Sequence, residues 1–112
     1  MADQTESTET ETAIREIEDE SEFDRVLESE DRVLVDFYAD WCGPCQMMEP
    51  TMEAVSNAVD APVIKVDIDA FPQIVAHFNV SSIPTVIGFK QGVPADRLIG
   101  VQDADSVRQL VA

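Results

Sequence analysis

The chain has 112 residues, of which 45% are hydrophobic, so it is long enough for one domain with a single core and too short for two. Its 23 acidic residues outnumber 7 basic ones and give a formal net charge of −16, which argues against nucleic acid as a partner because phosphates would be repelled. No apolar run approaches the roughly 20 residues that span a bilayer, so we expect no contact with a membrane.

The kind of basic residue adds to this picture. Only two of the basic side chains are lysines, Lys65 and Lys90. An acid excess with few lysines favours a halophile protein, adapted to high internal salt where counter-ions screen the self-repulsion. The alternative is an ordinary acidic protein with a solubilising tail.

The first segment, residues 1–12, is rich in Thr, Ser and Glu and has no large aliphatic side chain after Met1. It cannot bury enough surface to order itself, so we predict a disordered acidic tail followed by one domain at 13–112. The N-terminus also lacks the basic start and apolar stretch of a secretory signal. These features predict a cytoplasmic protein.

Hydrophobic patterning and turn residues predict nine elements in the rest of the chain. In chain order they are a weak strand at 13–17, a helix capped by residues 19–21, a strand at 33–38, a helix at 46–58 kinked by Pro50, a strand at 62–68, a helix at 69–78, a hairpin of strands at 85–90 and 97–99, and a helix from 103 to 111. This order predicts an α/β fold, in which a mixed sheet of four to five strands is flanked by about four helices.

The segment WCGPC holds the only two cysteines, Cys42 and Cys45. A zinc site uses four ligands, and the chain offers this one pair and a single histidine, His77, so we predict no metal site. A permanent disulfide across so short a loop would stabilise the fold only weakly. In a reducing cytosol, a close cysteine pair is more often catalytic than structural. We therefore interpret the pair as a redox centre.

The predicted helix start separates the roles of the two cysteines. Cys42 at the helix N-terminus faces unpaired N–H groups that favour a thiolate, whereas Cys45 lies one turn along, within disulfide reach, and should be the more shielded thiol. Pro44 fits the first turn, where its missing N–H costs nothing. We predict that Cys42 attacks a substrate disulfide and that Cys45 resolves the mixed disulfide.

Asp36 interrupts an otherwise apolar strand. Burial should raise the pKa of this carboxyl, which suits a proton acceptor for Cys45 near neutral pH. Lys65, in the equivalent part of the next apolar strand, is the candidate counter-charge. Two alternatives stay open, a buried ion pair with no catalytic part and a bent strand that exposes Asp36.

With these motifs in order, residues 13–112 closely resemble the thioredoxin family. The resemblance rests on WCGPC in a βαβ setting, Asp36 in VDF, Pro50 in the following helix, Lys65 in IKVDID, Pro84 in IPT, Gly92 in the hairpin turn and Gly100 after the last strand. It implies the thioredoxin fold for the whole domain.

The resemblance also implies a substrate-binding face. Pro84 would be a cis proline that brings the backbone of Ile83 alongside Cys42, where an extended substrate segment could pair with it. The residues implied around the cysteines are Trp41, Gly43, Pro44, Ile83, Pro84 and Gly100. For Trp41 the alternative is ordinary packing.

The implied activity is that of a general protein-disulfide reductant. It would be a monomer that carries two electrons from a thioredoxin reductase, typically a flavoprotein, to disulfide-containing client proteins, and it would need no bound cofactor. The alternatives are an oxidant, isomerase or dedicated donor of the same fold, and a binding subunit that does not use its cysteines. Two departures from the family bear on the site: Tyr38 stands where tryptophan is common, and Gln46 stands where a basic residue is common.

Overall fold

The computed structural model describes residues 14–112. Its elements are β1 (Ile14–Glu16), α2 (Glu20–Ser29), β2 (Arg32–Tyr38), α3 (Gly43–Ala58), β3 (Val63–Asp67), α4 (Pro72–His77), β4 (Thr85–Lys90), β5 (Val93–Ile99) and α5 (Ala104–Gln109). The nine predicted elements are therefore all present in the predicted order. The tail predicted at 1–12 lies outside the described residues.

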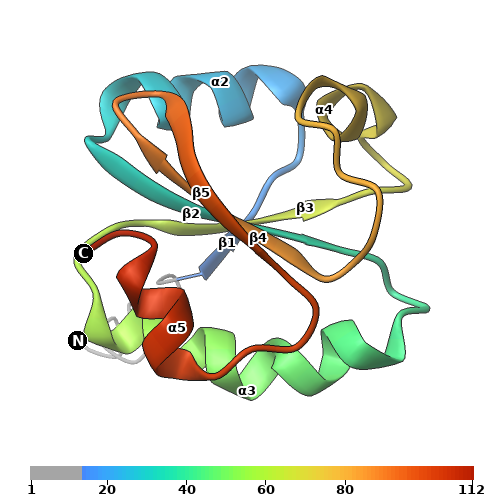
Figure 1. The fold of residues 1–112 in the computed structure, drawn as a ribbon. Coiled ribbons are helices and arrows are strands. Elements are labelled where there is room, and N and C mark those ends of the chain that lie inside the picture. Colours follow the sequence, from blue (N-terminus) through green and yellow to red (C-terminus); the bar gives the residue numbers. More distant parts are fainter. Residues whose placement is uncertain (1–13) are drawn as a thin grey trace, which may run out of the picture.

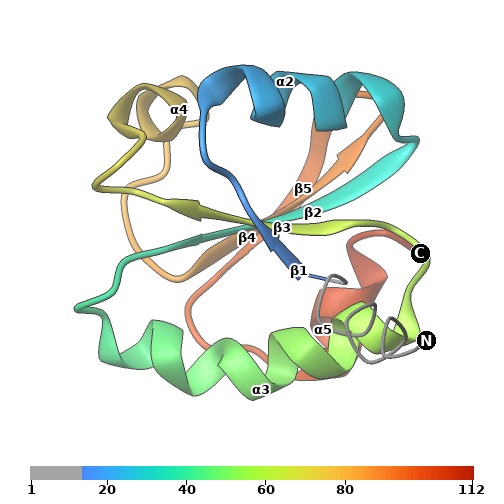
Figure 2. The same ribbon diagram turned by 180° about the vertical axis from the view of Figure 1, so that it is seen from behind.

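The five strands form one mixed sheet in the order β1-β3-β2-β4-β5. β1, β3 and β2 run parallel, whereas β4 and β5 are antiparallel additions. Helices α2 and α4 cover one face of the sheet, and α3 and α5 cover the other (Figures 1 and 2). This architecture confirms the predicted mixed sheet flanked by helices.

The central strand β2 is buried on both faces, and its alternation assigns each side chain to a layer. Val33, Val35 and Phe37 belong to the core under α2 and α4. Leu34 belongs to the core under α3 and α5. Asp36 has the parity of Leu34, so its carboxyl lies on the α3 face, the same face that carries the segment with the cysteines.

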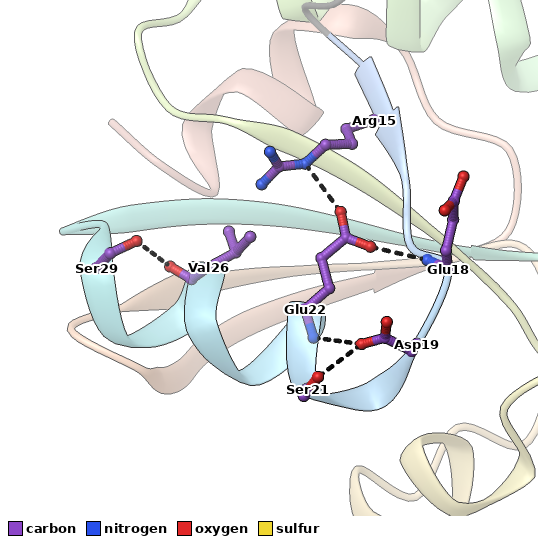
Figure 3. A network of polar contacts seen from close by, with 7 residues as sticks. All are labelled: Arg15, Glu18, Asp19, Ser21, Glu22, Val26 and Ser29. Carbon is purple, nitrogen blue, oxygen red and sulfur yellow. Dashed lines mark hydrogen bonds and ion pairs between the residues drawn. The ribbon is translucent and has the colours of Figure 1, made fainter.

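Helix α2 begins where its capping residues predict, and Figure 3 shows the contacts that fix it. The Asp19 carboxylate accepts from the backbone N–H of Glu22 at 2.8 Å. The Glu22 carboxylate in turn accepts from the backbone N–H of Glu18 at 2.9 Å and pairs with Arg15 at 3.5 Å. These bonds hold β1 and the start of α2 together.

Three element boundaries differ from the prediction by three residues or more, and the first is that of helix α3, which begins at Gly43 instead of 46. Helix α4 begins at Pro72 instead of 69, because Asp67 ends its strand in a turn in which its carboxylate accepts from the N–H of Asp69 at 2.9 Å. Strand β5 begins at Val93 instead of 97. It includes Pro94, which lies on an edge strand beside a register irregularity, where a missing N–H is tolerated.

None of the helices within residues 14–112 combines the length and the apolar character needed to cross a bilayer.

Candidate functional site

The two cysteines sit at the junction between β2 and α3. Cys42 is the N-cap of α3, and Pro44 occupies the first turn. Cys42 and Cys45 are joined by a disulfide, with their α-carbons 5.3 Å apart. The prediction that one helical turn brings the pair within bonding reach is confirmed.

The helix terminus is directed at one of the two sulfurs. The Cys42 Sγ accepts a hydrogen bond from the backbone N–H of Cys45 at 3.1 Å. The carbonyl of Cys42 also accepts from the N–H of Gln46 at 3.2 Å, which is the first regular bond of α3. An anion at the N-cap position is favoured by such unpaired N–H groups and by the helix dipole. The geometry therefore supports thiolate character at Cys42.

The prediction that Cys45 is the more shielded residue is wrong for this disulfide form. Cys42 is 4% exposed and Cys45 is 6% exposed. Both pack in one small cluster with Tyr38 and Ala39, because the bond places the two sulfurs against the same wall at the end of β2. The two cysteines are distinguished by position on the helix and by hydrogen bonding instead of by burial.

The residues beside the cysteines in WCGPC face solvent. Trp41 is 68% exposed, and Gly43 and Pro44 are exposed as well. The indole N–H of Trp41 donates to the carboxylate of Asp69 at 2.8 Å, which anchors the ring across the loop after β3. Ordinary core packing is thus excluded for Trp41, whose ring is left available for contact.

A second segment reaches the cysteines from β4 and β5. The Ile83–Pro84 peptide is cis, as the resemblance implied. Ile83 packs against the cysteine cluster, and the N–H of Gly100 donates to the carbonyl of Pro84 at 2.8 Å. Gly100 has φ = 86°, a conformation that glycine adopts at little cost. The structure thus brings Ile83, Pro84 and Gly100 to the same end of the sheet as the cysteines.

Sequence reasoning missed two exposed apolar residues near this site. Met47 on α3 is 68% exposed, and Val101, after Gly100, is 49% exposed. The backbone N–H of Gln102 lies 3.1 Å from the Sδ of Met48, which seats the segment after Gly100 on α3. The exposure of Met47 could have been predicted from the sequence, because Met47 lies outside the apolar stripe of α3 that includes Met48.

Asp36 is buried, with 5% of its surface exposed, so the alternative of a bent strand that exposes it is excluded. Its Oδ1 atom has no hydrogen-bond partner among the described residues. Desolvation raises the pKa of Asp36 from 3.8 to about 7, with Lys65 lowering it and Glu49 raising it. The carboxyl is therefore a buried polar group whose surroundings favour its protonated form.

Lys65 is the direct register neighbour of Asp36 across the β2–β3 ladder. Its ammonium, however, forms its ion pair with Glu49 at 3.9 Å and lies 4.2 Å from the centre of the Tyr38 ring. Lys65 lowers the pKa of Asp36 from a distance. The alternative of a buried ion pair between Asp36 and Lys65 is therefore not found, since the ion pair of Lys65 is with Glu49 on α3.

Two clefts open on this side of the sheet. The first, about 420 Å³, is lined by Ile14, Asp36, Glu49, Met52, Glu53, Ser56, Asn57 and Lys65. The second, about 240 Å³, is lined by Tyr38, Ala39, Asp40, Cys45, Gln46, Glu49 and Lys65. Asp36 and Cys45 thus each border a cleft, and the two clefts have Glu49 and Lys65 in common. In the part of the chain from 14 to 112, no group of three or more acidic, histidine or cysteine side chains is arranged to hold a metal ion.

The amino-acid sequence is similar to those of known proteins. The thioredoxin family model matches residues 14–112. A thioredoxin of Chlamydia muridarum is 48% identical over 81 residues, which cover 71% of this chain and 79% of the relative. A thioredoxin of Staphylococcus epidermidis is 41% identical over 94 residues, which cover 82% of this chain and 89% of the relative.

Solved structures agree with the sequence relatives. A mutant thioredoxin from Halobacterium salinarum superposes with a TM-score of 0.83 at 38% identity, covering 88% of this chain and 87% of that one. A second structure comes from work on the thiol resolving mechanism in yeast mitochondrial 1-Cys peroxiredoxin via glutathione/thioredoxin systems. It has a TM-score of 0.81 at 30% identity, and the match covers 89% of this chain and 94% of that one.

Proposed function

This chain belongs to the thioredoxin family and is a protein disulfide reductase with a redox-active cysteine pair, and on that basis we propose that Cys42 is the attacking cysteine and Cys45 the resolving one. The observation that carries the assignment is the hydrogen bond from the N–H of Cys45 to the Sγ of Cys42 at the N-cap of α3. A thiolate formed at Cys42 keeps that stabilising donor, whereas Cys45 lies inside the helix.

The proposed cycle transfers two electrons to the client. The Cys42 thiolate attacks one sulfur of a client disulfide; that S–S bond breaks, the other client sulfur leaves as a thiolate, and a mixed disulfide forms. Cys45 then loses its proton and attacks the Cys42 sulfur, which releases the second client thiolate. The client is reduced, and the protein is left with the Cys42–Cys45 disulfide that this structure contains.

Asp36 is the proposed acceptor of the Cys45 proton. Its support is burial, an Oδ1 atom with no hydrogen-bond partner among residues 14–112, and a pKa of about 7, which matches a base that works near neutrality. Lys65 is the proposed charge partner that moderates this pKa from the neighbouring strand. Neither residue forms a bond to the client in this proposal.

The proposed client surface surrounds the disulfide. Extended client segments would pair with the backbone of Ile83, beside the cis proline, and contact the exposed ring of Trp41. Gly43, Pro44 and Gly100 provide close backbone approach on either side. We add Met47 and Val101 to this surface because of their exposure.

The electron donor is proposed to be a thioredoxin reductase and the location the cytoplasm. The acidic charge balance and the relative from Halobacterium salinarum support a halophile protein. Peroxiredoxins are one candidate client class, given the subject of the yeast structure. The proposed division into a tail at 1–12 and a domain at 13–112 agrees with the family match at 14–112.

The roles of the cysteines are tested by trapping. In the Cys45→Ser variant, resolution is blocked, so clients should remain attached to Cys42 and appear as a ladder of many mixed disulfides on a non-reducing gel. A single band would indicate a dedicated donor instead of a general reductant. Insulin reduction should be lost in Cys42→Ser, and retention of activity in that variant would contradict the assignment of the nucleophile.

A further inference from the structure

A row of charged residues crosses the sheet on the α3 face. Glu16, Lys65 and Asp36 are register neighbours on β1, β3 and β2. Helix α3 adds Glu49 and Glu53, which line the cleft that Asp36 borders. On this part of the face, the ammonium of Lys65 is therefore the one positive charge that the described residues place beside four carboxylates. Its position decides which carboxylate it stabilises in the ionised form.

The ammonium lies on the α3 side of the row. Its ion pair is with Glu49 at 3.9 Å, and the Tyr38 ring holds it from another direction at 4.2 Å. Glu49 and Lys65 are also the two residues that line both clefts, the one bordered by Asp36 and the one bordered by Cys45. The Glu49–Lys65 pair thus borders both the cleft that Asp36 lines and the cleft that Cys45 lines.

We propose that Glu49 is a positioning residue for the resolving step, because its pairing with Lys65 holds the ammonium away from Asp36 and preserves the proton affinity of that buried carboxyl. The inference rests on the proposed role of Asp36 as proton acceptor. It deepens that role by adding a surface residue that tunes it. Glu49 itself bonds neither to a cysteine nor to a client.

The two effects of Glu49 act in the same direction. Its own negative charge raises the pKa of Asp36. Its ion pair also restrains a lysine that would otherwise be free to approach the unpaired Oδ1 atom and lower that pKa further. A carboxylate with a lower pKa is a weaker base for the Cys45 thiol.

The direct test is a titration of Asp36, monitored by NMR of its carboxyl carbon. The disulfide form is used because its cysteines do not titrate. We expect Glu49→Gln to lower the midpoint of Asp36 by about half a pH unit, a roughly threefold change in its acid dissociation constant. Glu53→Gln is the matched control, because it removes the same charge from the same cleft without an ion pair to Lys65 among the described contacts. An unchanged midpoint in Glu49→Gln, or an equal shift in both variants, would overturn the proposal.

A double-variant cycle isolates the route through the lysine. In a Lys65→Met background, Glu49→Gln should shift the midpoint of Asp36 by less than it does in the parent chain, because only the direct charge effect is left. Equal shifts in both backgrounds would show that Glu49 acts by its own charge alone and would contradict its role in positioning Lys65. Circular dichroism confirms that each variant is folded.

The rate of the resolving step provides a second, independent measurement of how Glu49 affects Asp36. The pH profile for release of a client from the mixed disulfide should move to lower pH in Glu49→Gln, together with the midpoint of Asp36. If the midpoint moves and the rate profile does not, the positioning of Lys65 by Glu49 is supported, whereas the proton-acceptor role of Asp36 fails and with it the effect of Glu49 on the resolving step. Added salt should shrink the effect, because Glu49 is 56% exposed.

Discussion

The two faces of the sheet are covered by the same number of helices but hold different side chains. Under α2 and α4, the described core consists of apolar residues, among them Phe23, Phe78 and Phe89 in edge-to-face or tilted contact. Under α3 and α5, the sheet carries the half-buried Lys65 and the buried Asp36, whose Oδ1 atom has no hydrogen bond within the described part of the chain.

The two faces of the sheet therefore have different roles, since one stabilises the fold and the other carries the group proposed to accept a proton. Aromatic packing on the α2 face contributes transfer and contact energy, and the buried hydroxyl of Thr85 on that face is satisfied because it donates to the carbonyl of Ser82 at 2.6 Å. On the α3 face, the carboxyl of Asp36 costs stability whenever it is ionised, but its raised pKa is what fits it to take a proton near neutral pH. We therefore expect substitutions on the first face to change stability alone, and substitutions on the second to trade stability against rate.

The largest effect on stability is expected from Phe89→Ala, which breaks the apolar face. Phe89 is fully buried, and it pairs with Val33 at the start of β2, at the opposite end of that strand from the cysteines. Loss of its ring should lower the free energy of unfolding by about 3–5 kcal/mol. Denaturant unfolding measures this, and insulin reduction per folded molecule should be unchanged. A loss of less than about 1 kcal/mol would show that this face does not dominate stability.

The next largest effect is a gain in the free energy of unfolding. Asp36→Leu removes the buried carboxyl and should raise the free energy of unfolding at pH 8 by something on the order of 3 kcal/mol. Above its ordinary pKa of 3.8, this carboxyl is ionised in the unfolded chain, whereas in the folded protein it keeps its proton up to about pH 7. The parent chain therefore loses stability as pH rises from about 4 to 7, and the variant should not. Equal pH dependence in the two proteins would contradict the burial cost.

A smaller effect on stability is expected at Gly100, whose backbone is part of the proposed client surface. Gly100→Ala places a side chain at φ = 86°, with no atom within 4 Å of the new Cβ, so backbone strain is the whole expected effect, about 1 kcal/mol of destabilisation. Gly43→Ala is the control, because it also meets open space but has no positive φ and lies in the first turn of a helix. Equal denaturation midpoints for the two variants would contradict the strain at Gly100.

The smallest effect concerns surface contact. Met47→Ser should leave unfolding unchanged within about 0.5 kcal/mol, since the side chain is exposed, and should lower kcat/KM for a protein client by about threefold. Val93→Ser is the control, because it is comparably exposed at 62% but begins β5, at the hairpin turn away from the cysteines. Equal kinetics for the two variants would remove Met47 from the client surface.

Local chemistry made much of this predictable from the sequence. Asp19 indicates the start of its helix because a short acceptor satisfies free N–H groups, and Cys42 and Cys45 indicate a redox pair through their spacing at a helix terminus. The apolar strand around Asp36 indicated both its burial and its raised pKa. The direction of the pKa shift follows from desolvation, its largest cause, which depends on burial, whereas the charges of Lys65 and Glu49 change the size of the shift.

The contacts that escaped prediction are those set by distant packing. The sequence pairs Lys65 with Asp36 by strand position, but the choice of Glu49 depends on how α3 crosses β3, which no local pattern encodes. The start of α4 differs from the prediction because the carboxylate of Asp67 accepts from the N–H of Asp69 and holds that residue in a turn before the helix. The similar burial of the two cysteines depends on the disulfide and on Ile83 from a remote segment.

The buried carboxyl of Asp36 on the α3 face is the proposed acceptor of the proton of the resolving cysteine. The most direct test of this role is the rate of release of a client mixed disulfide in Asp36→Asn, measured in single turnover from pH 6 to 9. We expect slower resolution in the variant and loss of the titration near pH 7 that the parent chain should show. Equal rates in the variant and the parent chain at every pH would contradict this role.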